Sequence, residues 1–278
     1  MTSSGAAAGE TPRGRKAHDR ILRCLIASLN DLRLVELERL ILHEAHDQDR
    51  LASLRARIEA EGEQHNPVIV SSQGDCCLVL DGAHRVRALD ELGCRFVLAQ
   101  FVEPPERAES WAHLLNGVGL DELGGVEGIE VSERPDSGVR LAEVEVAGGG
   151  RAFLRTREEG LLAEVRALWA LQALYPEGVL VRRVEANGRP SPAEGEAIVR
   201  YRPFAPEELV EIVRSGAVLP AGITRFRVRE RVLGVRYPLE QIKDGDTSSR
   251  NAELRAFVER LWAENRIRYY EEPVVLFE

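Results

Sequence analysis

Hydrophobic positions in this chain follow two different spacings, which predict a mixture of helices and strands. Helical spacing is clearest in residues 49–61, where Leu51, Leu54 and Ile58 share one face, and in residues 161–175. Further helices are predicted at residues 16–29, 83–92, 108–115, 206–215, 239–243 and 252–264. Strand patterns fall at residues 32–37, 67–72, 76–80, 96–102, 138–146, 151–155, 179–185, 197–204, 225–228, 231–235 and 274–277. The interleaving of the two patterns predicts a mixed α+β fold.

The order of the elements predicts two folded units. Residues 1–15 are rich in Ala, Gly, Ser and Thr, so we expect a disordered tail. Residues 16–106 form a first unit with an N-terminal helix, a hairpin around residues 73–74 and a further helix and strand. Residues 107–278 form a second α+β lobe, and no repeat or linker divides them.

Composition places the chain among globular proteins and makes several function classes improbable. The chain has 278 residues, of which 44% are hydrophobic, and a net charge of -9, which argues against a protein that coats nucleic acid. The longest apolar runs are too short for a membrane span, and no export signal is recognisable at the N-terminus. We therefore expect a cytoplasmic protein without membrane contact. The four cysteines show no metal-binding or disulfide spacing and are expected to be small buried hydrophobes: Cys24, Cys76, Cys77 and Cys94.

The most informative segment is residues 80–90, in which an apolar strand runs through a tight turn into a helix. Gly82 permits the turn, and Ala83 begins a segment with helical spacing. The free N–H groups and the positive end of the helix dipole favour an anion at this point. His84 and Arg85 add charge and hydrogen-bond donors there, so the turn is a candidate phosphate site. The plain alternative is a strand, turn and helix with His and Arg at the surface.

Two carboxylates are candidates for chemistry at strand ends. Asp81 directly precedes the turn and could hold Mg²⁺, orient a nucleophile or simply cap the helix. Glu44 follows a strand and precedes the helix at residues 49–61, so it belongs to a loop that a rigid scaffold can present.

Several separated blocks together resemble a known family. The sequence Asp-Gly-Ala-His-Arg, followed by a helix that ends in Leu-Gly, resembles the nucleotide-binding motif of the ParB/sulfiredoxin-like fold, and within it the free L-serine kinases. The resemblance runs from about Leu32 to the C-terminus. It rests on residues 42–44, 79–85, 92–94, 111–113, 201–203, 220–226, 231–233 and 238–239.

The resemblance implies a fold and an activity. It implies a ParB/sulfiredoxin-like N-terminal domain, a second α+β lobe and an active site in the cleft between them. The implied reaction is phosphorylation of free L-serine to O-phospho-L-serine, with ATP or ADP as donor and Mg²⁺ as cofactor, feeding specialised metabolism of the siderophore or diaminopropionate type. Glu44 aligns with the proposed general base of the family, which would take the proton of the serine hydroxyl.

The amino acid needs donors for its carboxylate and acceptors for its ammonium group. Thr224 and Arg225 offer a hydroxyl and a guanidinium, while Trp111 and His113 offer an apolar wall and a donor. Both motifs match the kinase family. We therefore expect the nucleotide on the first lobe and the amino acid held by both lobes.

Two rival functions stay open at this stage. One is a ParB-like DNA-binding regulator that responds to nucleotide or haem, although no helix-turn-helix is evident and basic residues cluster only near the N-terminus. The other is a free L-threonine kinase, since one methyl group discriminates by only about 1–3 kcal/mol. Sulfiredoxin chemistry lacks its nucleophile, because Ala83 stands where that enzyme needs a reactive cysteine. The chain has no Gly-x-x-x-x-Gly-Lys-Ser/Thr loop and no His-Glu-x-x-His motif. The sequence gives no oligomeric state.

Overall fold

The computed structural model describes residues 29–46, 48–103, 109–134, 140–176, 179–186 and 190–270. Three predictions lie wholly or mainly outside these residues: the tail at 1–15, the helix at 16–29 and the strand at 274–277. Within the described part of the chain, no helix has the length and apolar composition needed to cross a membrane.

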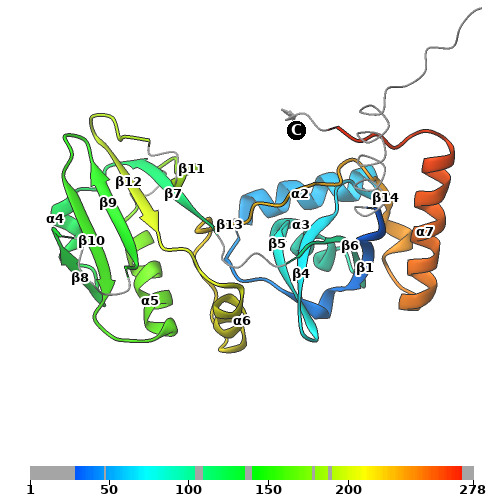
Figure 1. The fold of residues 1–278 in the computed structure, drawn as a ribbon, viewed down its shortest axis with the longest axis horizontal. Coiled ribbons are helices and arrows are strands. Elements are labelled where there is room, and N and C mark those ends of the chain that lie inside the picture. The colour runs from blue at the N-terminus through cyan, green and yellow to red at the C-terminus, as the bar shows by residue number, and fades with distance from the viewer. Residues whose placement is uncertain are drawn as a thin grey trace, which may run out of the picture.

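The molecule is elongated, with two lobes side by side, as Figure 1 shows. The first lobe contains a five-stranded mixed sheet with the order β1-β6-β4-β5-β2. Its strands are β1 (Leu32–Glu36), β2 (Leu40–Ile41), β4 (Val68–Gln73), β5 (Cys76–Asp81) and β6 (Phe96–Phe101). Two helices, α2 (Gln48–Glu61) and α3 (Ala83–Glu91), pack their apolar sides into the core of this lobe. The hairpin predicted around Gly74 is confirmed by the antiparallel pairing of β4 with β5.

The C-terminal part of the chain returns to the first lobe. Strand β14 (Tyr237–Pro238) pairs with β3 (Glu63–Gln64), a 3₁₀ turn follows at Leu239–Gln241, and α7 (Thr247–Ala263) packs beside β1. Tyr237, Ile242 and Leu254 are buried in the core of this lobe. A boundary near residue 106 stays a prediction, and the second unit as predicted includes a segment that packs on the first.

The second lobe is an antiparallel sheet with helices against it. The strand order is β11-β7-β12-β9-β10-β8, with β13 paired to β7. Its strands are β7 (Glu109–Asn116), β8 (Ile129–Ser132), β9 (Ala142–Val146), β10 (Arg151–Thr156), β11 (Arg182–Glu185), β12 (Glu196–Tyr201) and β13 (Thr224–Arg225). The helices are α4 (Leu120–Leu123), α5 (Leu161–Gln172) and α6 (Pro206–Arg214), the last of which lies between the lobes in Figure 1.

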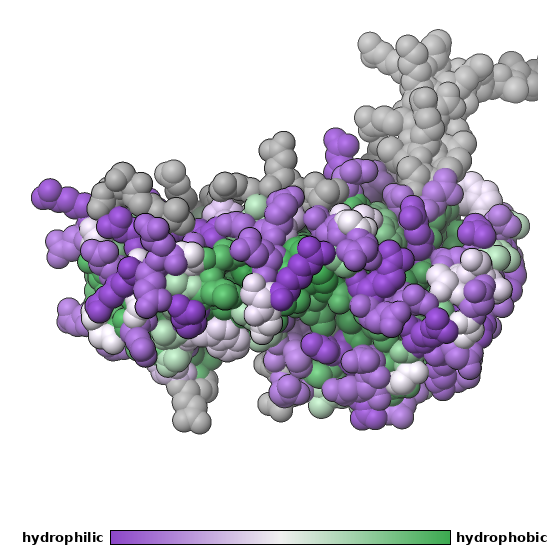
Figure 2. Space-filling view, turned by 90° about the horizontal axis from the view of Figure 1, so that it is seen from below, coloured by the Kyte–Doolittle hydropathy of each residue, from purple (hydrophilic) through white to green (hydrophobic). Residues whose placement is uncertain are grey.

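Strand β5 connects the two cores, because its side chains alternate between them. Cys77 and Val79 face the core of the first lobe, whereas Leu78 and Leu80 pack with the core of the second. Figure 2 accordingly shows apolar residues gathered in the middle of one face, between the lobes, with hydrophilic residues over most of the rest. The strand that leads to the turn at Gly82 is therefore fixed from both sides.

Several predicted elements are wrong. The helix predicted at 108–115 is wrong for residues 109–115, which belong to β7, a strand that lies between β11 and β12. Ala112 to Leu115 are buried in a row. Burial on both faces removes the alternation by which a strand is recognised. Residues 231–235 are not a strand, and the strand predicted at 225–228 is reduced to β13. The helix at 239–243 is only a 3₁₀ turn, and β8 was not predicted.

Candidate active site

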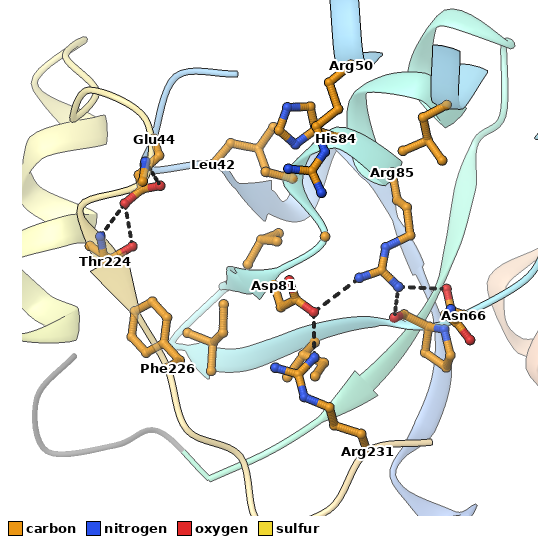
Figure 3. Close-up of a pocket in the computed structure, with 18 of the residues that line it drawn as sticks. Leu42, Glu44, Arg50, Asn66, Asp81, His84, Arg85, Thr224, Phe226 and Arg231 are labelled. Atoms are coloured by element: carbon orange, nitrogen blue, oxygen red, sulfur yellow. Dashed lines mark hydrogen bonds and ion pairs between the residues drawn. The ribbon is translucent and has the colours of Figure 1, made fainter. Parts of the chain in front are cut away.

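A cavity of about 1070 Å³ lies between the two lobes. Its walls come from α2, from the end of β5 and the start of α3, and from β7, β11 and the chain at 221–233. Nine of the predicted site residues line it: Glu44, Asp81, Gly82, Ala83, His84, Arg85, Trp111, Thr224 and Arg225. Figure 3 shows Glu44 on one side of this hollow and Asp81 with the start of α3 on the other.

The turn at Gly82 has the shape that the sequence predicts. Gly82 is the N-cap of α3 with φ 102°, a left-handed conformation that favours glycine. A Cβ at this position would lie 2.8 Å from Cγ1 of Val68 and 2.9 Å from Nε of Arg85, so a side chain does not fit. The first N–H groups of a helix have no partner within the helix, which leaves the start of α3 suited to an anion.

Asp81 does not cap α3 but pairs with two arginines. Its Oδ2 lies 2.6 Å from Nη1 of Arg231 and 3.2 Å from Nη2 of Arg85. Burial opposes ionisation of this carboxyl, but the two guanidinium groups outweigh that effect and lower its pKa. Asp81 is therefore an ionised carboxylate at the edge of the cavity.

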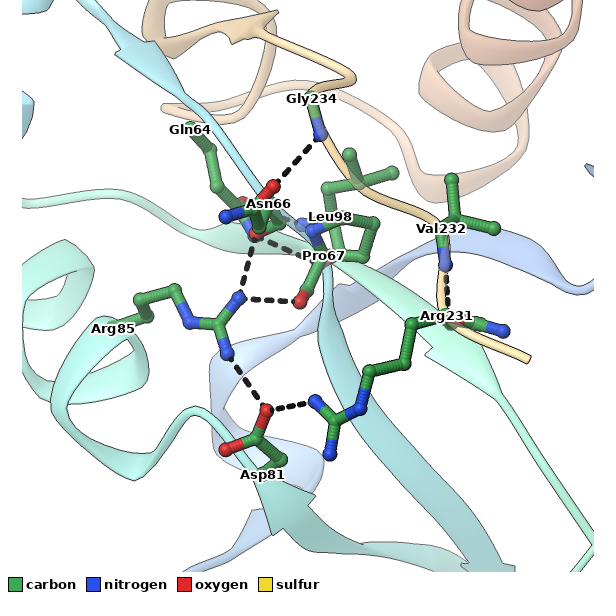
Figure 4. A network of polar contacts seen from close by, with 10 residues as sticks. Gln64, Asn66, Pro67, Asp81, Arg85, Leu98, Arg231, Val232 and Gly234 are labelled. Atoms are coloured by element: carbon green, nitrogen blue, oxygen red, sulfur yellow. Dashed lines mark hydrogen bonds and ion pairs between the residues drawn. The ribbon is translucent and has the colours of Figure 1, made fainter. Parts of the chain in front are cut away.

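Arg85 is held within the protein rather than pointing freely into the cavity. Besides Asp81, its Nη1 donates to the carbonyl oxygens of Pro67 at 2.6 Å and Asn66 at 3.2 Å (Figure 4). The guanidinium thus connects the start of α3 to the chain before β4. Its contribution to phosphate binding stays a prediction, and the structure gives it a second task in holding the turn.

A C-terminal strap, defined as residues 230–234, crosses beside this turn (Figure 4). Gln100 accepts a hydrogen bond from the N–H of Val232 at 2.9 Å, and Asn66 accepts one from the N–H of Gly234 at 2.7 Å. Arg231 directly precedes the first of these two anchors and reaches Asp81. The strap brings a cation to the turn at Gly82 from a distant part of the sequence.

His84 and Arg50 line the cavity beside the turn at Gly82. The imidazole of His84 is perpendicular to that of His46, with ring centroids 6.3 Å apart. Arg50, on α2, reaches toward His84 in Figure 3. These side chains extend the basic wall of the cavity beyond the start of α3.

Glu44 is fixed by donors from the opposite lobe. Residues 43–45 form a parallel bridge with Leu219, through backbone hydrogen bonds of 2.8 Å. The Oε1 atom of Glu44 accepts from the N–H of Thr224 at 2.5 Å and from its hydroxyl at 2.6 Å, and Oε2 accepts from the N–H of Gly222 at 2.9 Å. A carboxylate has about four lone-pair positions, so one position on Oε2 is left for a further donor.

Thr224 and His43 form a buried support behind Glu44. The ring Nε2 of His43 lies 2.7 Å from the hydroxyl oxygen of Thr224. Because the hydroxyl proton is directed at Glu44, the histidine donates. Burial lowers the pKa of His43, although the charge of Glu44 opposes the shift, so this histidine is neutral. Thr224, predicted to bind substrate, therefore orients Glu44.

His113 is buried and does not line the cavity. Its Nε2 donates to the carbonyl of Gly222 at 2.8 Å, and its Nδ1 lies 3.1 Å from the hydroxyl of Tyr175. Tyr201 completes this cluster through hydrogen bonds with His113 and Tyr175. Burial lowers the pKa of His113 to about 4. The predicted contact of His113 with serine stays unsupported, and its position behind Gly222 indicates a supporting role.

Trp111 and Arg225 meet at the end of the cavity near Glu44. The guanidinium of Arg225 lies over the Trp111 ring, 4.5 Å from its centroid. It also pairs with Glu185 at 2.6 Å, and Glu109 is 4.0 Å away. Trp111 is in place as a wall, whereas Arg225 already has a carboxylate partner.

The cavity is positively charged, although the chain as a whole is acidic. Seven arginines line it, against three acidic side chains, namely Glu44, Glu61 and Asp81. The arginines are Arg50, Arg57, Arg85, Arg183, Arg225, Arg227 and Arg231. Such a cavity attracts polyanions, and a nucleotide is one. Among the described residues, no group of three or more His, Cys, Asp or Glu side chains is placed to hold a metal ion.

Four residues at this site carry no predicted role: His43, Arg183, Gly222 and Arg231. His43, Gly222 and Arg231 belong to blocks of the family resemblance, and this was the available signal. The partners of these three residues are 109 or more positions away in the chain, so spacing alone does not reveal them. Nothing in the sequence distinguishes Arg183 from its neighbour Arg182.

Comparisons with known proteins confirm the resemblance. No family model matches the chain. It is 26% identical over 250 residues to the ATP-dependent L-serine kinase SbnI of Staphylococcus aureus (strain NCTC 8325 / PS 47), which covers 89% of this chain and 97% of that protein. The match identifies the chain as a homologue of SbnI.

Solved structures agree with this fold. SbnI with a C-terminal truncation superposes with a TM-score of 0.75 at 24% identity, covering 84% of this chain and 98% of that one. A mutant free serine kinase in complex with ADP gives a TM-score of 0.60 at 20% identity, covering 76% and 94%. A conserved hypothetical protein from Pyrococcus furiosus gives 0.56 at 19% identity, covering 76% and 97%. The mixed α+β fold predicted from the sequence is confirmed.

Proposed function

We propose that this chain, as a homologue of the L-serine kinase SbnI, transfers the terminal phosphoryl group of ATP to the hydroxyl of free L-serine. The products are O-phospho-L-serine and ADP. The observation that carries the proposal is the geometry of one cavity, in which the carboxylate of Glu44 and the turn at Gly82 lie on opposite sides. A phosphoryl transfer needs a base for the hydroxyl and donors for the phosphates, and this geometry supports Glu44 and the turn at Gly82 in these two roles.

Glu44 is the proposed general base. A serine hydroxyl is a poor nucleophile at neutral pH, so its proton must be taken up as it attacks. The unused lone pair on Oε2 can accept that proton, while Gly222 and Thr224 keep the carboxylate in place. His43 is hydrogen-bonded to Thr224 and His113 to Gly222, so the two histidines hold these donors in position.

The turn at residues 81–85 is the proposed phosphate site. Backbone N–H groups at the start of α3 and the side chain of His84 are suited to bind the phosphates, and Arg231 and Arg85 add positive charge. A structure of a free serine kinase contains ADP, which supports nucleotide binding by this fold.

Mg²⁺ is part of the proposal through Asp81. Magnesium is commonly held by one or two carboxylates together with substrate phosphates, and Asp81 is an ionised carboxylate whose Oδ1 makes no hydrogen bond or ion pair among those observed in the described residues. Asp81 and the nucleotide phosphates would therefore together supply oxygen ligands suited to Mg²⁺. The metal would neutralise charge on the phosphates.

Trp111 and Arg225 complete the proposed site as the wall of the amino-acid pocket. Their cation–π contact and the pairing of Arg225 with Glu185 make this wall rigid. We place the reaction in the cytoplasm, and no observation favours the DNA-binding alternative.

One assay tests the proposed activity, and it also tests which nucleotide is the donor and which amino acid is the acceptor. Purified protein is incubated with Mg²⁺ and either ATP or ADP, together with L-serine, L-threonine or each other common amino acid. Formation of O-phospho-L-serine with ATP supports the proposal. A product with threonine alone would make the chain a threonine kinase, and a product only with ADP would change the donor. Consumption of nucleotide without any phosphorylated amino acid contradicts the proposed function.

A further inference from the structure

The proposed kinase must hold the carboxylate of its amino acid, and the residues predicted for this task are already occupied. The guanidinium of Arg225 pairs with Glu185 at 2.6 Å, and the hydroxyl of Thr224 donates to Glu44 at 2.6 Å. His113 is 2% exposed and bonded to Gly222. A substrate carboxylate therefore needs another cation at this end of the cavity.

Arg183 is such a cation. It lies on β11, lines the cavity and is exposed. Within the described ranges, the hydrogen bonds and ion pairs observed leave it without a partner, unlike Arg85, Arg225 and Arg231.

The side chain of Arg183 lies beside the residue that holds Glu44. A Cβ built on Gly222 would be 2.3 Å from Nε and 2.6 Å from Cζ of Arg183, so the guanidinium rests directly on this glycine. The N–H of Gly222 in turn donates to Oε2 of Glu44 at 2.9 Å. The absence of a side chain at Gly222, where φ is +78°, is what lets Arg183 approach the catalytic carboxylate.

The strand register directs Arg183 toward the same side as the aromatic wall. In the pairing of β11 with β7, Arg183 is opposite His113 and Glu185 is opposite Trp111. Residues two apart on a strand share a face, so Arg183 and Trp111 belong to one side of the sheet. The positive charge of Arg183 also contributes to the lowered pKa of His113, after burial, which agrees with this proximity.

We propose that Arg183 binds the α-carboxylate of the amino-acid substrate while Glu44 faces its hydroxyl, with Gly222 between them. The inference rests on the proposed kinase function. In serine, only Cβ and Cα separate the hydroxyl from the carboxylate group. This short separation fits a base, Glu44, and a cation, Arg183, that both contact Gly222. The planar guanidinium can bind a carboxylate through two parallel hydrogen bonds. Amino alcohols and amides without that carboxylate are thereby selected against.

The matched control is Arg182, the preceding residue on the same strand. Its side chain is 56% exposed and pairs with Glu196, and it does not line the cavity. Arg183→Ala and Arg182→Ala each remove one exposed guanidinium from β11, so the net charge changes alike, and Arg182→Ala additionally removes the pair with Glu196. Arg183→Lys keeps the charge but not the bidentate geometry.

The experiment compares L-serine with L-serinamide, whose carboxylate is replaced by a neutral amide. Phosphoryl transfer from ATP is measured for the wild type, Arg183→Ala, Arg183→Lys and Arg182→Ala, and L-serine binding is measured by calorimetry. We expect Arg183→Ala to raise the KM for L-serine by at least about tenfold, since charge-assisted hydrogen bonds to the substrate carboxylate are lost. The KM for ATP should stay within about twofold, Arg183→Lys should be intermediate, and Arg182→Ala should match the wild type.

The decisive quantity is the ratio of kcat/KM for serine to that for serinamide. The ratio should be large in the wild type and should approach one in Arg183→Ala. If Arg183→Ala loses activity while the ratio stays at the wild-type value, or if its serine KM is unchanged, the inference is overturned and the kinase function stands. If the wild type transfers no phosphate, the kinase function fails, and calorimetry then decides the inference, because serine binding must still depend on Arg183 and not on Arg182.

Discussion

Thr224 donates both its backbone N–H and its hydroxyl to one oxygen of Glu44, at 2.5 Å and 2.6 Å. The two residues are 180 positions apart in the chain and belong to different lobes. The second lobe thus sets the orientation of Glu44, and the geometry of this proposed base depends on how the two lobes pack together. Changes at Thr224 should therefore affect the chemical step more than binding.

Thr224→Val removes the hydroxyl donor and keeps the shape and the backbone N–H. We expect kcat to fall by about tenfold, because one hydrogen bond to a charged group contributes about 1.5–3 kcal/mol and the N–H contact is retained. The KM values for ATP and serine should change little. Thr224→Ser, which keeps the hydroxyl, should recover most of the rate, and a Val variant with wild-type kcat would remove Thr224 from this role.

Gly82→Ala should destabilise the protein and weaken nucleotide binding. The new methyl would meet Val68 and Arg85 at 2.8–2.9 Å, in addition to the strain of a left-handed φ. We expect a loss of about 2–4 kcal/mol in the free energy of unfolding, measured with denaturant.

The control for that substitution is Gly74→Ala in the β4–β5 hairpin. Gly74 also has a positive φ, 68°, but has nothing within 4 Å of a built Cβ. Gly74→Ala should lower the free energy of unfolding by about 1 kcal/mol, which is the cost of the left-handed backbone conformation alone. Equal losses at the two glycines would show that contact with Arg85 and Val68 contributes nothing.

Arg231→Ala should weaken nucleotide binding by about 1–3 kcal/mol, because a cation is lost from a partly desolvated phosphate site. Arg85→Ala should weaken nucleotide binding similarly and also lower stability, since it removes the hydrogen bonds that Arg85 donates to the carbonyls of Pro67 and Asn66, of which only Asn66 keeps a second observed donor, from Gln64. Nucleotide titration and denaturant unfolding of both variants separate the two effects. Unchanged ATP affinity in both variants would contradict the assignment of the phosphate site.

The buried imidazole of His113 predicts a pH dependence of stability. Its pKa is about 4 in the folded protein against an ordinary value of 6.5, so the unfolded chain binds more protons between these values. The free energy of unfolding should therefore decrease as pH falls from about 6.5 to 4, by on the order of 3 kcal/mol from this residue. His113→Asn should show a smaller slope over this interval, and an unchanged slope would exclude His113 as its source.

The first lobe was predictable because its signals are local. The strand at β5, the glycine turn and α3 follow one another within residues 76–91, and the apolar positions of α2 show clear helical spacing. In the second lobe β7 was misassigned, since Ala112 to Leu115 are all buried and no period remains.

The residues that form the site were easier to predict than the role of each residue within it. The family resemblance implies that Glu44, Asp81 and Thr224 share one cavity, and all three line it. That Arg225 pairs with Glu185, while Arg183 has no observed partner among the described residues, depends on how β11 and β13 flank β7. Such relationships arise from tertiary packing and leave no pattern in the sequence.

The most direct test of the account is the rate of O-phospho-L-serine formation by Glu44→Gln at saturating ATP and L-serine, with the binding of both substrates measured separately. Glu61→Gln is the matched control, because this glutamate lines the same cavity from α2. The account predicts that kcat falls by about 10²–10⁴-fold in Glu44→Gln, with substrate affinities nearly unchanged, and stays at the wild-type value in Glu61→Gln. Turnover by a folded Glu44→Gln protein at the wild-type rate would contradict it.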